Sequence, residues 1–513
     1  MKGFSEKIFL RLEMPSEEDS ISDQKRILQA LEALGYERVQ IPLSVLQRLY
    51  PLCRQAGFSI TVTLVYREAD WIMVDLEAGD TTGQHYGLAV DYGSTTILMQ
   101  LLDMNSGAVI DQVKAVNGQT AYGTDILTRI TYAMEDSSHV DDLQRATVET
   151  LESLLDQLAE NTGIPAAKCP VMILSGNTTM IHFLLKLDAW TVFASPYAPV
   201  VTDPGFFGGQ ELGMAFAGMV YIIPAASNYI GGDIVSGLLQ VDLQDKEEIG
   251  LFFDIGTNGE LVIGNKEWLM AGAGAAGPAL EGYISRYGMR AAPGAIDTVK
   301  IDGSELRFTT IGGQKPVGIC GSGIIDLLAQ MRLEGWINIA GELNPAASDR
   351  IIWLEEEREY AAVYALASES ADGHPLYFSQ TDIAQYLDTK AAAYTMVECL
   401  LETAGVEFEE LSHLYLSGAF TAHSDLESAI TIGMFPDIPR ENYTVLTNTS
   451  LDGARILLLD RSRLGDLRAI SENMYCVQFA SVPDFLVRMQ AAKFIPHTDM
   501  DRYPSVQRRL SGR

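Results

Sequence analysis

Two short stretches, far apart in the chain, each end an apolar strand with an aspartate. Residues 88–96 read Leu-Ala-Val-Asp-Tyr-Gly-Ser-Thr-Thr, and residues 251–259 read Leu-Phe-Phe-Asp-Ile-Gly-Thr-Asn-Gly. In both, the Asp-x-Gly turn leads directly into a second apolar strand. Such a turn presents a carboxylate together with a row of backbone N–H groups, which is what Mg²⁺ and a polyphosphate require. The pattern predicts that Asp91 and Asp254 are catalytic magnesium ligands, although ordinary turn chemistry would select the same residues.

The small and polar residues of these two turns are the next candidates for phosphate contacts. Residues that only shape a turn would be of the same types, so both phosphate binding and simple turn formation stay open. They are Gly93, Ser94, Thr95 and Thr96 in the first turn, and Gly256, Thr257, Asn258 and Gly259 in the second.

Two other passages fit the same kind of ligand. Asn177 lies in a Gly-Asn-Thr-Thr turn, where it either faces the γ-phosphate or only shapes the turn. Gly321, Ser322 and Gly323 open a predicted helix, whose N–H groups and dipole favour an anion or ribose hydroxyls. Helix capping alone would also explain Ser322.

Composition restricts the class of protein. A chain of 513 residues is long enough for two to four domains with large cores. Its formal net charge of −32 disfavours nucleic acid and anionic membranes as partners, because phosphate binding depends on clustered Lys and Arg. No apolar run approaches the ~20 residues of a membrane helix, and the start lacks the apolar core of a signal peptide. A cytoplasmic location is therefore the default expectation.

The five cysteines are widely separated in the sequence. Iron–sulfur and structural zinc sites usually show closely spaced cysteine pairs. The spacing therefore predicts buried or unreactive thiols and no iron–sulfur cluster in this chain. His182, in an apolar helical stretch, is interpreted as a packed histidine rather than a metal ligand.

Hydrophobic periodicity divides the chain into a small N-terminal α+β domain and two larger α/β lobes. Each lobe begins with the strand–Asp-x-Gly–strand pattern and continues with helices and further buried strands. A polar stretch at 341–375 is interpreted as an excursion, and the basic C-terminal tail is expected to fray. The predicted domains are 1–85, 86–235, 236–495 and 496–513.

The ordered motifs resemble those of the acetate/sugar kinase, heat-shock ATPase and actin superfamily (ASKHA). In that pattern residues 91–96 and 254–259 are the two phosphate segments, and 414–420 is the adenosine segment. The connecting helices correspond to 229–237 and 448–455. The resemblance implies an α/β fold of two duplicated ribonuclease-H-like lobes, of the actin or hexokinase type, that grip ATP and Mg²⁺. It also implies that Asp233 orients the attacking water, and that Gly418 and Ala419 approach adenine or ribose.

Within this superfamily the chain resembles the reductive activators of corrinoid proteins. The N-terminal domain resembles their linker domain through Met14-Pro-Ser and Ser22-Asp-Gln-Lys-Arg, and the resemblance covers about residues 5–495. The phrases that carry it are residues 117–129, 175–180, 254–260, 275–282, 288–297 and 318–326.

Members of that family use ATP to drive the uphill one-electron reduction of a cob(II)alamin-type cofactor to cobalt(I) on a partner protein. The resemblance thus implies that nucleotide-driven closure of the lobes docks and reactivates a corrinoid protein of a methyltransferase system. Such activators ordinarily carry an iron–sulfur domain bound by four closely spaced cysteines, whereas this sequence lacks that pattern. We therefore expect electrons from a separate donor protein. A homodimer is possible.

Three alternatives remain open from the sequence. The first is a small-molecule kinase of the ASKHA fold. The second is a nucleotide-gated module that binds a corrinoid protein without a redox role. The third is a degenerate scaffold, which the retention of both Asp91 and Asp254 disfavours.

Overall fold

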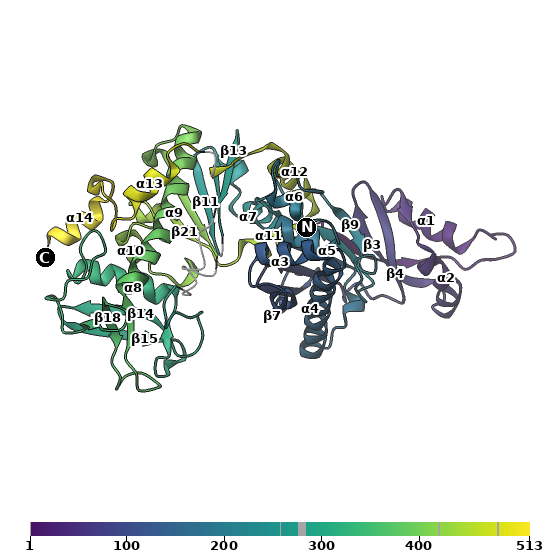
Figure 1. Cartoon of the computed structure of the whole chain (residues 1–513). Helices are drawn as coiled ribbons and strands as arrows, with labels where there is room; N and C mark the ends of the chain where they lie inside the picture. Colours follow the sequence, from purple (N-terminus) through teal and green to yellow (C-terminus); the bar gives the residue numbers. More distant parts are fainter. Residues whose placement is uncertain (1, 257, 275–283, 419–420, 480–481, 513) are drawn as a thin grey trace. The chain divides into compact units, whose positions relative to one another are not determined.

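The described residues of this computed structural model form five β-sheets with helices packed on them (Figure 1). The chain divides into two compact units, and each unit takes a segment from late in the sequence. Unit 1 consists of Met1–Asp242 and Thr449–Asn473, and unit 2 consists of Leu243–Asn448 and Met474–Arg513. The structure describes residues 2–256, 258–274, 284–418, 421–479 and 482–512.

The N-terminal domain is a sheet in the order β1-β3-β4-β2 with two helices. Ser22 caps the first helix by accepting a hydrogen bond from Lys25 N, as its residue type predicts. Ile27, Leu31 and Cys53 turn their side chains into the core shared with the sheet. The mixture of strands and helices agrees with the α+β class predicted for this domain. The elements are β1 (Ser5–Arg11), α1 (Asp23–Ala33), β2 (Val39–Gln40), α2 (Leu43–Gln55), β3 (Ser59–Arg67) and β4 (Asp70–Ala78).

Unit 1 also holds a larger sheet in the order β7-β6-β5-β8-β10-β9. Strands β5, β6 and β7 form an antiparallel meander, while β8 joins β5 in parallel and β10 joins β8 in parallel. Every residue of β8 is buried, as expected for a central parallel strand covered on both faces. The strands are β5 (Tyr86–Tyr92), β6 (Thr96–Asp103), β7 (Val109–Val116), β8 (Val171–Gly176), β9 (Gly205–Gly208) and β10 (Met219–Ile222).

Unit 2 repeats this plan in a sheet ordered β21-β20-β11-β12-β13-β22. Again the first three strands form an antiparallel meander, the fourth joins the first in parallel and the fifth joins the fourth in parallel. The predicted α/β fold with two duplicated ribonuclease-H-like lobes is confirmed. The strands are β11 (Gly250–Ile255), β12 (Gly259–Gly264), β13 (Leu269–Gly274), β20 (His413–Ser417), β21 (Tyr443–Val445) and β22 (Met474–Val477).

Helices cover the six-stranded sheet of each unit. In unit 1, α4 packs on the β6–β7 side with its leucines inward and its acidic residues outward. In unit 2, α9 and α13 lie against each other (Figure 1). Unit 1 contains α3 (Ile126–Glu135), α4 (His139–Thr162), α5 (Thr178–Leu184), α6 (Trp190–Phe193), α7 (Gly232–Val241), α11 (Thr449–Leu459) and α12 (Leu464–Asn473). Unit 2 contains α8 (Gly321–Leu333), α9 (Gln380–Ala404), α10 (Leu426–Thr431), α13 (Phe485–Ala492) and α14 (Pro504–Ser511).

Helix α11 belongs to unit 1 because it packs directly on α7. A Cβ atom on Gly453 would lie only 1.9 Å from the carbonyl oxygen of Ser236. The two helices therefore approach each other more closely than any other residue type at position 453 would allow.

The polar excursion is more ordered than its sequence indicates. Within this stretch β17 and β18 form, and β19 follows it to complete a small sheet ordered β17-β18-β19, while a second small sheet, ordered β15-β14-β16, lies earlier in unit 2. Their strands are β14 (Ala295–Asp302), β15 (Glu305–Thr310), β16 (Gly318–Ile319), β17 (Ile351–Leu354), β18 (Glu359–Ala365) and β19 (Leu376–Ser379).

The expectation that the C-terminal tail frays is wrong. Tyr503, the N-cap of α14, and Val506 within that helix are fully buried in the core of unit 2. Ser505 donates from its backbone N to Asp437 Oδ2 at 2.6 Å and from its hydroxyl to Asp437 Oδ1 at 2.7 Å. Burial of these two side chains and the hydrogen bonds to Asp437 attach this segment to unit 2. Across the described residues, no helix combines the length and apolar character needed to cross a bilayer.

Inside unit 1 the N-terminal domain is joined to the larger sheet by Glu77 on β4. Its carboxylate pairs with Lys7 on β1 and with Lys168, just before β8. Burial opposes the ionisation of Glu77, but hydrogen bonds from the two lysines and from Thr81 outweigh burial and lower its pKa from 4.5 to about 2.

This triad predicts an acid-sensitive contribution to stability. Because the folded pKa of Glu77 lies below its unfolded value, its stabilising effect is complete above about pH 4.5 and is lost as the pH falls toward 2. The difference in urea unfolding free energy between wild type and Glu77→Gln should shrink over that range. Exposed Glu37→Gln is the control. A difference that stays constant from pH 6 to pH 2 would contradict the role of Glu77.

Candidate functional site

The first Asp-x-Gly turn joins β5 to β6 in unit 1. Asp91 is half-buried at the end of β5, opposite Leu98 on β6 and beside Ser175 on β8. Gly93 is required by packing, since a Cβ there would lie 2.5 Å from Thr96 O. Ser94, Thr95 and Thr96 are half-buried within the turn and the start of β6.

Asn117 fixes the shape of this turn from outside it. Its side-chain amide donates to Gly93 O at 2.9 Å, and its backbone N donates to Thr95 O at 2.9 Å. Asn117 is fully buried, and its side-chain oxygen accepts from Gln119 N at 3.0 Å. Asn117 lies in one of the sequence motifs, but no role was predicted for it.

Asn177 and Asp233 lie next to each other at the same end of the sheet. Asn177 is the N-cap of α5, with its side-chain oxygen accepting from Met180 N at 3.0 Å. Asp233 stands in the first turn of α7, and its Oδ1 accepts from Ile234 N at 2.9 Å. A Cβ on Gly231 would lie 2.5 Å from Asn177 Cα and 2.6 Å from Asp233 Oδ1, so this glycine permits the close approach. Since Asn177 Oδ1 is used by the cap, a ligand contact would come from its amide N–H groups.

Asp91 is linked to the same end of the sheet through hydroxyl groups. Ser450 on α11 donates from its hydroxyl to Asp91 Oδ1 at 2.8 Å. Ser450 also contacts the hydroxyl of Ser175 at 2.9 Å, which in turn contacts Ser236 on α7 at 2.8 Å. Unit 1 thus brings the predicted Asp91, Asn177 and Asp233 together, with serines that were not predicted as site residues.

The second Asp-x-Gly turn joins β11 to β12 in unit 2. Asp254 is half-buried, opposite Glu260 on β12 and beside Ser417 on β20, whose hydroxyl lies 3.4 Å from Asp254 Oδ2. Gly256 N donates to Asn258 O at 2.9 Å and closes the turn. The side chain of Asn258 is exposed, while Gly259 is buried as the first residue of β12.

The bend after β20 also needs glycine. Gly418 has φ +108°, a backbone conformation that L side chains rarely adopt, and a Cβ there would lie 2.1 Å from Ile255 O. The bend therefore lies against the strand that carries Asp254. The predicted contacts of Thr257 and Ala419 fall outside the described residues.

The Gly-rich start of α8 is used for packing. Gly321, Ser322 and Gly323 are all buried, and a Cβ on Gly323 would lie 2.4 Å from Ile296 O. The N-cap is Cys320, and the hydroxyl of Ser322 donates to Asp297 O at 3.1 Å. These bonds attach the helix to β14, and a role in ligand binding stays a prediction.

His182 is a packed histidine, as interpreted from the sequence. Its Nδ1 lies 2.7 Å from Thr178 O, and its Nε2 accepts from Val200 N at 3.1 Å. Because a carbonyl only accepts and a backbone N–H only donates, the ring is neutral with the proton on Nδ1. Burial lowers its pKa further from the physiological range.

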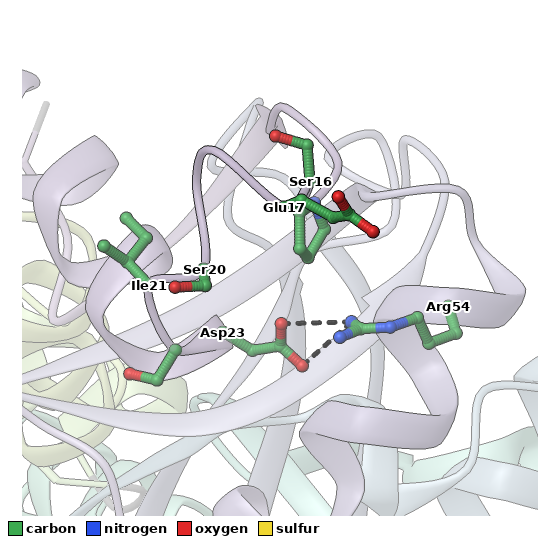
Figure 2. A pocket seen from close by; sticks show the side chains of 8 residues that line it. Ser16, Glu17, Ser20, Ile21, Asp23 and Arg54 are labelled. Carbon is green, nitrogen blue, oxygen red and sulfur yellow. Dashed lines mark hydrogen bonds and ion pairs between the residues drawn. The ribbon is translucent and has the colours of Figure 1, made fainter.

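A separate open pocket of about 630 Å³ lies in the N-terminal domain, between the loop before α1 and the end of α2 (Figure 2). Of the three charged residues that line it, Arg54 and Asp23 are paired, since Arg54 donates to both oxygens of Asp23 at 3.0 Å, and Glu17 is the third. None of the residues predicted to bind nucleotide lines this pocket.

Three family profiles match almost the entire chain in order. They are described as the RACo linker region over residues 1–83, the RACo middle region over residues 86–246, and the C-terminal ASKHA domain of RACo over residues 248–507. The chain belongs to the RACo family. The resemblance drawn from the sequence motifs is thereby confirmed.

Proteins similar to this RACo-family chain carry consistent names. A solved structure titled "Reductive activator for corrinoid,iron-sulfur protein" superposes with a TM-score of 0.89 at 33% sequence identity, covering 98% of this chain and 81% of that one. The corrinoid activation enzyme RamQ of Eubacterium limosum is 29% identical over 409 residues, which is 78% of this chain and 69% of that protein. The Co(II) methylated amine-specific corrinoid protein reductase of Methanosarcina barkeri is 25% identical over 421 residues, 76% of this chain and 73% of that protein.

Proposed function

We propose that this chain is an ATP-hydrolysing activator that returns the cobalt of a corrinoid protein from Co(II) to Co(I). The observation that carries the proposal is the match, over 98% of the chain, to a solved reductive activator. Two curated relatives, from different organisms, also have names that refer to activation or reduction of corrinoid proteins. A methyltransferase system is the context in which such a corrinoid protein would be reactivated.

The two Asp-x-Gly turns support the nucleotide part of this proposal. Asp91 and Asp254 each stand half-buried at the end of a strand, followed by a turn whose backbone packing requires glycine or closes tightly. Mg²⁺ in nucleotide sites is usually held by one or two carboxylates, with phosphate and water completing its shell. When bound, it would neutralise charge on the transferring phosphoryl group. Asp91 in unit 1 and Asp254 in unit 2 would each be a candidate carboxylate ligand, and the N–H groups of each turn would donate to phosphate oxygens.

Asp233 is the group proposed to orient the attacking water. Its carboxylate lies at the edge of the sheet beside Asn177, and one oxygen is held by Ile234 N. That bond helps to fix the orientation of the carboxylate, which would act as general base toward water. The amide of Asn177 would donate to the γ-phosphate.

The redox step requires one electron from outside. Co(II) gains one electron to become Co(I), and a separate low-potential donor protein loses it. ATP and water give ADP and phosphate, and the energy of this reaction drives the uphill transfer. The separate donor stays a prediction from the cysteine spacing.

The test combines the chain, a corrinoid protein in the Co(II) state, Mg²⁺–ATP and a reduced iron–sulfur protein as donor. We expect ATP turnover to rise several-fold when the corrinoid protein is added, with Co(I) absorption appearing only when ATP and donor are both present. A non-hydrolysable ATP analogue is the control. Phosphorylation of a metabolite without any corrinoid protein would instead indicate a kinase, and complex formation without turnover a binding module.

A further inference from the structure

Three buried serine hydroxyls connect Asp91 to the two packed helices of unit 1. Ser175 ends β8, Ser236 lies in the middle of α7, and Ser450 lies at the start of α11. Ser175 and Ser236 are fully buried and Ser450 is 6% exposed. The oxygen–oxygen distances are 2.8 Å from Ser236 to Ser175, 2.9 Å from Ser175 to Ser450 and 2.8 Å from Ser450 to Asp91 Oδ1.

The direction of these hydrogen bonds follows from the single proton that each serine hydroxyl can donate. An ionised carboxylate only accepts, so the single proton of the Ser450 hydroxyl is donated to Asp91. Ser450 Oγ can then only accept from Ser175, which uses the single proton of Ser175. Ser175 Oγ in turn accepts from Ser236. The three protons therefore form a chain that runs from α7 to Asp91 in one direction.

This chain of hydrogen bonds depends on the distance between helices α7 and α11. The hydroxyl of Ser236 also lies 3.0 Å from Asp233 O and 3.2 Å from Ser450 O, and these two carbonyl oxygens compete with Ser175 Oγ for its single proton. Gly453 holds the helices at this distance, because its missing side chain leaves room for Ser236 O. A shift of one helix along the other would break a hydrogen bond between these serines or the bond from Ser450 to Asp91.

We propose that Ser450 is a positioning residue that fixes the Asp91 carboxylate, and that Ser175 and Ser236 link this carboxylate to helix α7. This inference rests on the proposed function, in which Asp91 holds the magnesium–phosphate group. The α7 helix also carries Asp233 in its first turn. The orientation of the magnesium ligand and the placement of the water-orienting residue therefore depend on one helix pair.

The test is the magnesium dependence of ATP hydrolysis in Ser450→Ala. Losing a hydrogen bond to a carboxylate that must be oriented should raise the Mg²⁺ concentration for half-maximal turnover about tenfold. The maximal rate at saturating Mg²⁺ should fall less than this. Ser471→Ala is the matched control, since the Ser471 hydroxyl donates to Arg468 O on α12, away from Asp91. A lowered melting temperature with an unchanged Mg²⁺ requirement would show a purely structural role and overturn the inference.

A double-mutant comparison tests whether the serines act as one chain. Ser236→Ala should also raise the Mg²⁺ requirement, and the Ser236→Ala/Ser450→Ala double variant should show less than the product of the two single effects. Independent, multiplicative effects would contradict the link to α7. Wild-type protein without ATP turnover would remove the proposed function itself. Normal wild-type turnover with an unchanged Ser450→Ala variant would remove only this inference.

Discussion

Replacing Asp254 by alanine is expected to lower the rate of ATP hydrolysis by about 1,000-fold while the fold stays intact. The carboxylate stands half-buried where β11 ends, and the hydroxyl of Ser417 lies 3.4 Å from its Oδ2. The neighbours Phe253 and Ile255 are fully buried and keep the strand in register. The substitution thus removes the proposed magnesium ligand and leaves the apolar packing of the strand in place. Phosphate release under saturating Mg²⁺–ATP measures the rate, and circular dichroism checks the fold.

The matched control is Asp302→Ala, at the exposed end of β14 in the same unit. It removes the same charge and should leave turnover unchanged. Normal hydrolysis by Asp254→Ala would show that the second Asp-x-Gly turn has no role in phosphate chemistry. An equal loss in both variants would indicate that net charge rather than position matters.

The repeated strand–turn–strand pattern was readable from the sequence because it is local. An apolar strand, an aspartate and a glycine within a few residues determine a tight turn whatever the rest of the chain does. The order of motifs then placed Asp91, Asn177 and Asp233 in one lobe, and the structure brings the three to one end of one sheet. Buried strands such as β8 were predictable for the same reason, since their apolar runs are continuous.

The contacts that hold these residues could not be predicted from the sequence, because they join distant parts of the chain. Ser450 lies 359 positions from Asp91, and serine is common in any sequence, so no pattern distinguishes it. Ser175, Ser236 and Ser450 each lie within a segment quoted as a motif, yet only the packing of α7 on α11 shows that their hydroxyls meet. The ordered C-terminal end was missed for a similar reason. Its buried residues Pro496, His497, Tyr503 and Val506 are too few and too irregularly spaced to produce a periodic signal.

That ordered C-terminal end depends on a lysine that carries no nucleotide chemistry. Lys390 on α9 is fully buried, and its ammonium group donates to the carbonyl oxygens of Ala492, Phe494 and Pro496 at 2.5 to 2.6 Å. An ammonium has three protons, so each one is used. The lysine thereby ties the segment after α13 to the long helix of unit 2.

Lys390→Met keeps the length and apolar stem of the side chain, and we expect it to destabilise unit 2 by about 4 kcal/mol. Three buried carbonyl groups lose their hydrogen-bond donor. The free-energy cost of this loss exceeds the gain from no longer burying a charged group. The urea midpoint should fall, and hydrogen exchange should accelerate across residues 485–512. Lys493→Met is the matched control, because Lys493 pairs with Asp388 at the surface, where ion pairs contribute at most about 1 kcal/mol. Equal effects of the two substitutions would show that the three carbonyl bonds contribute no more to stability than an exposed ion pair does.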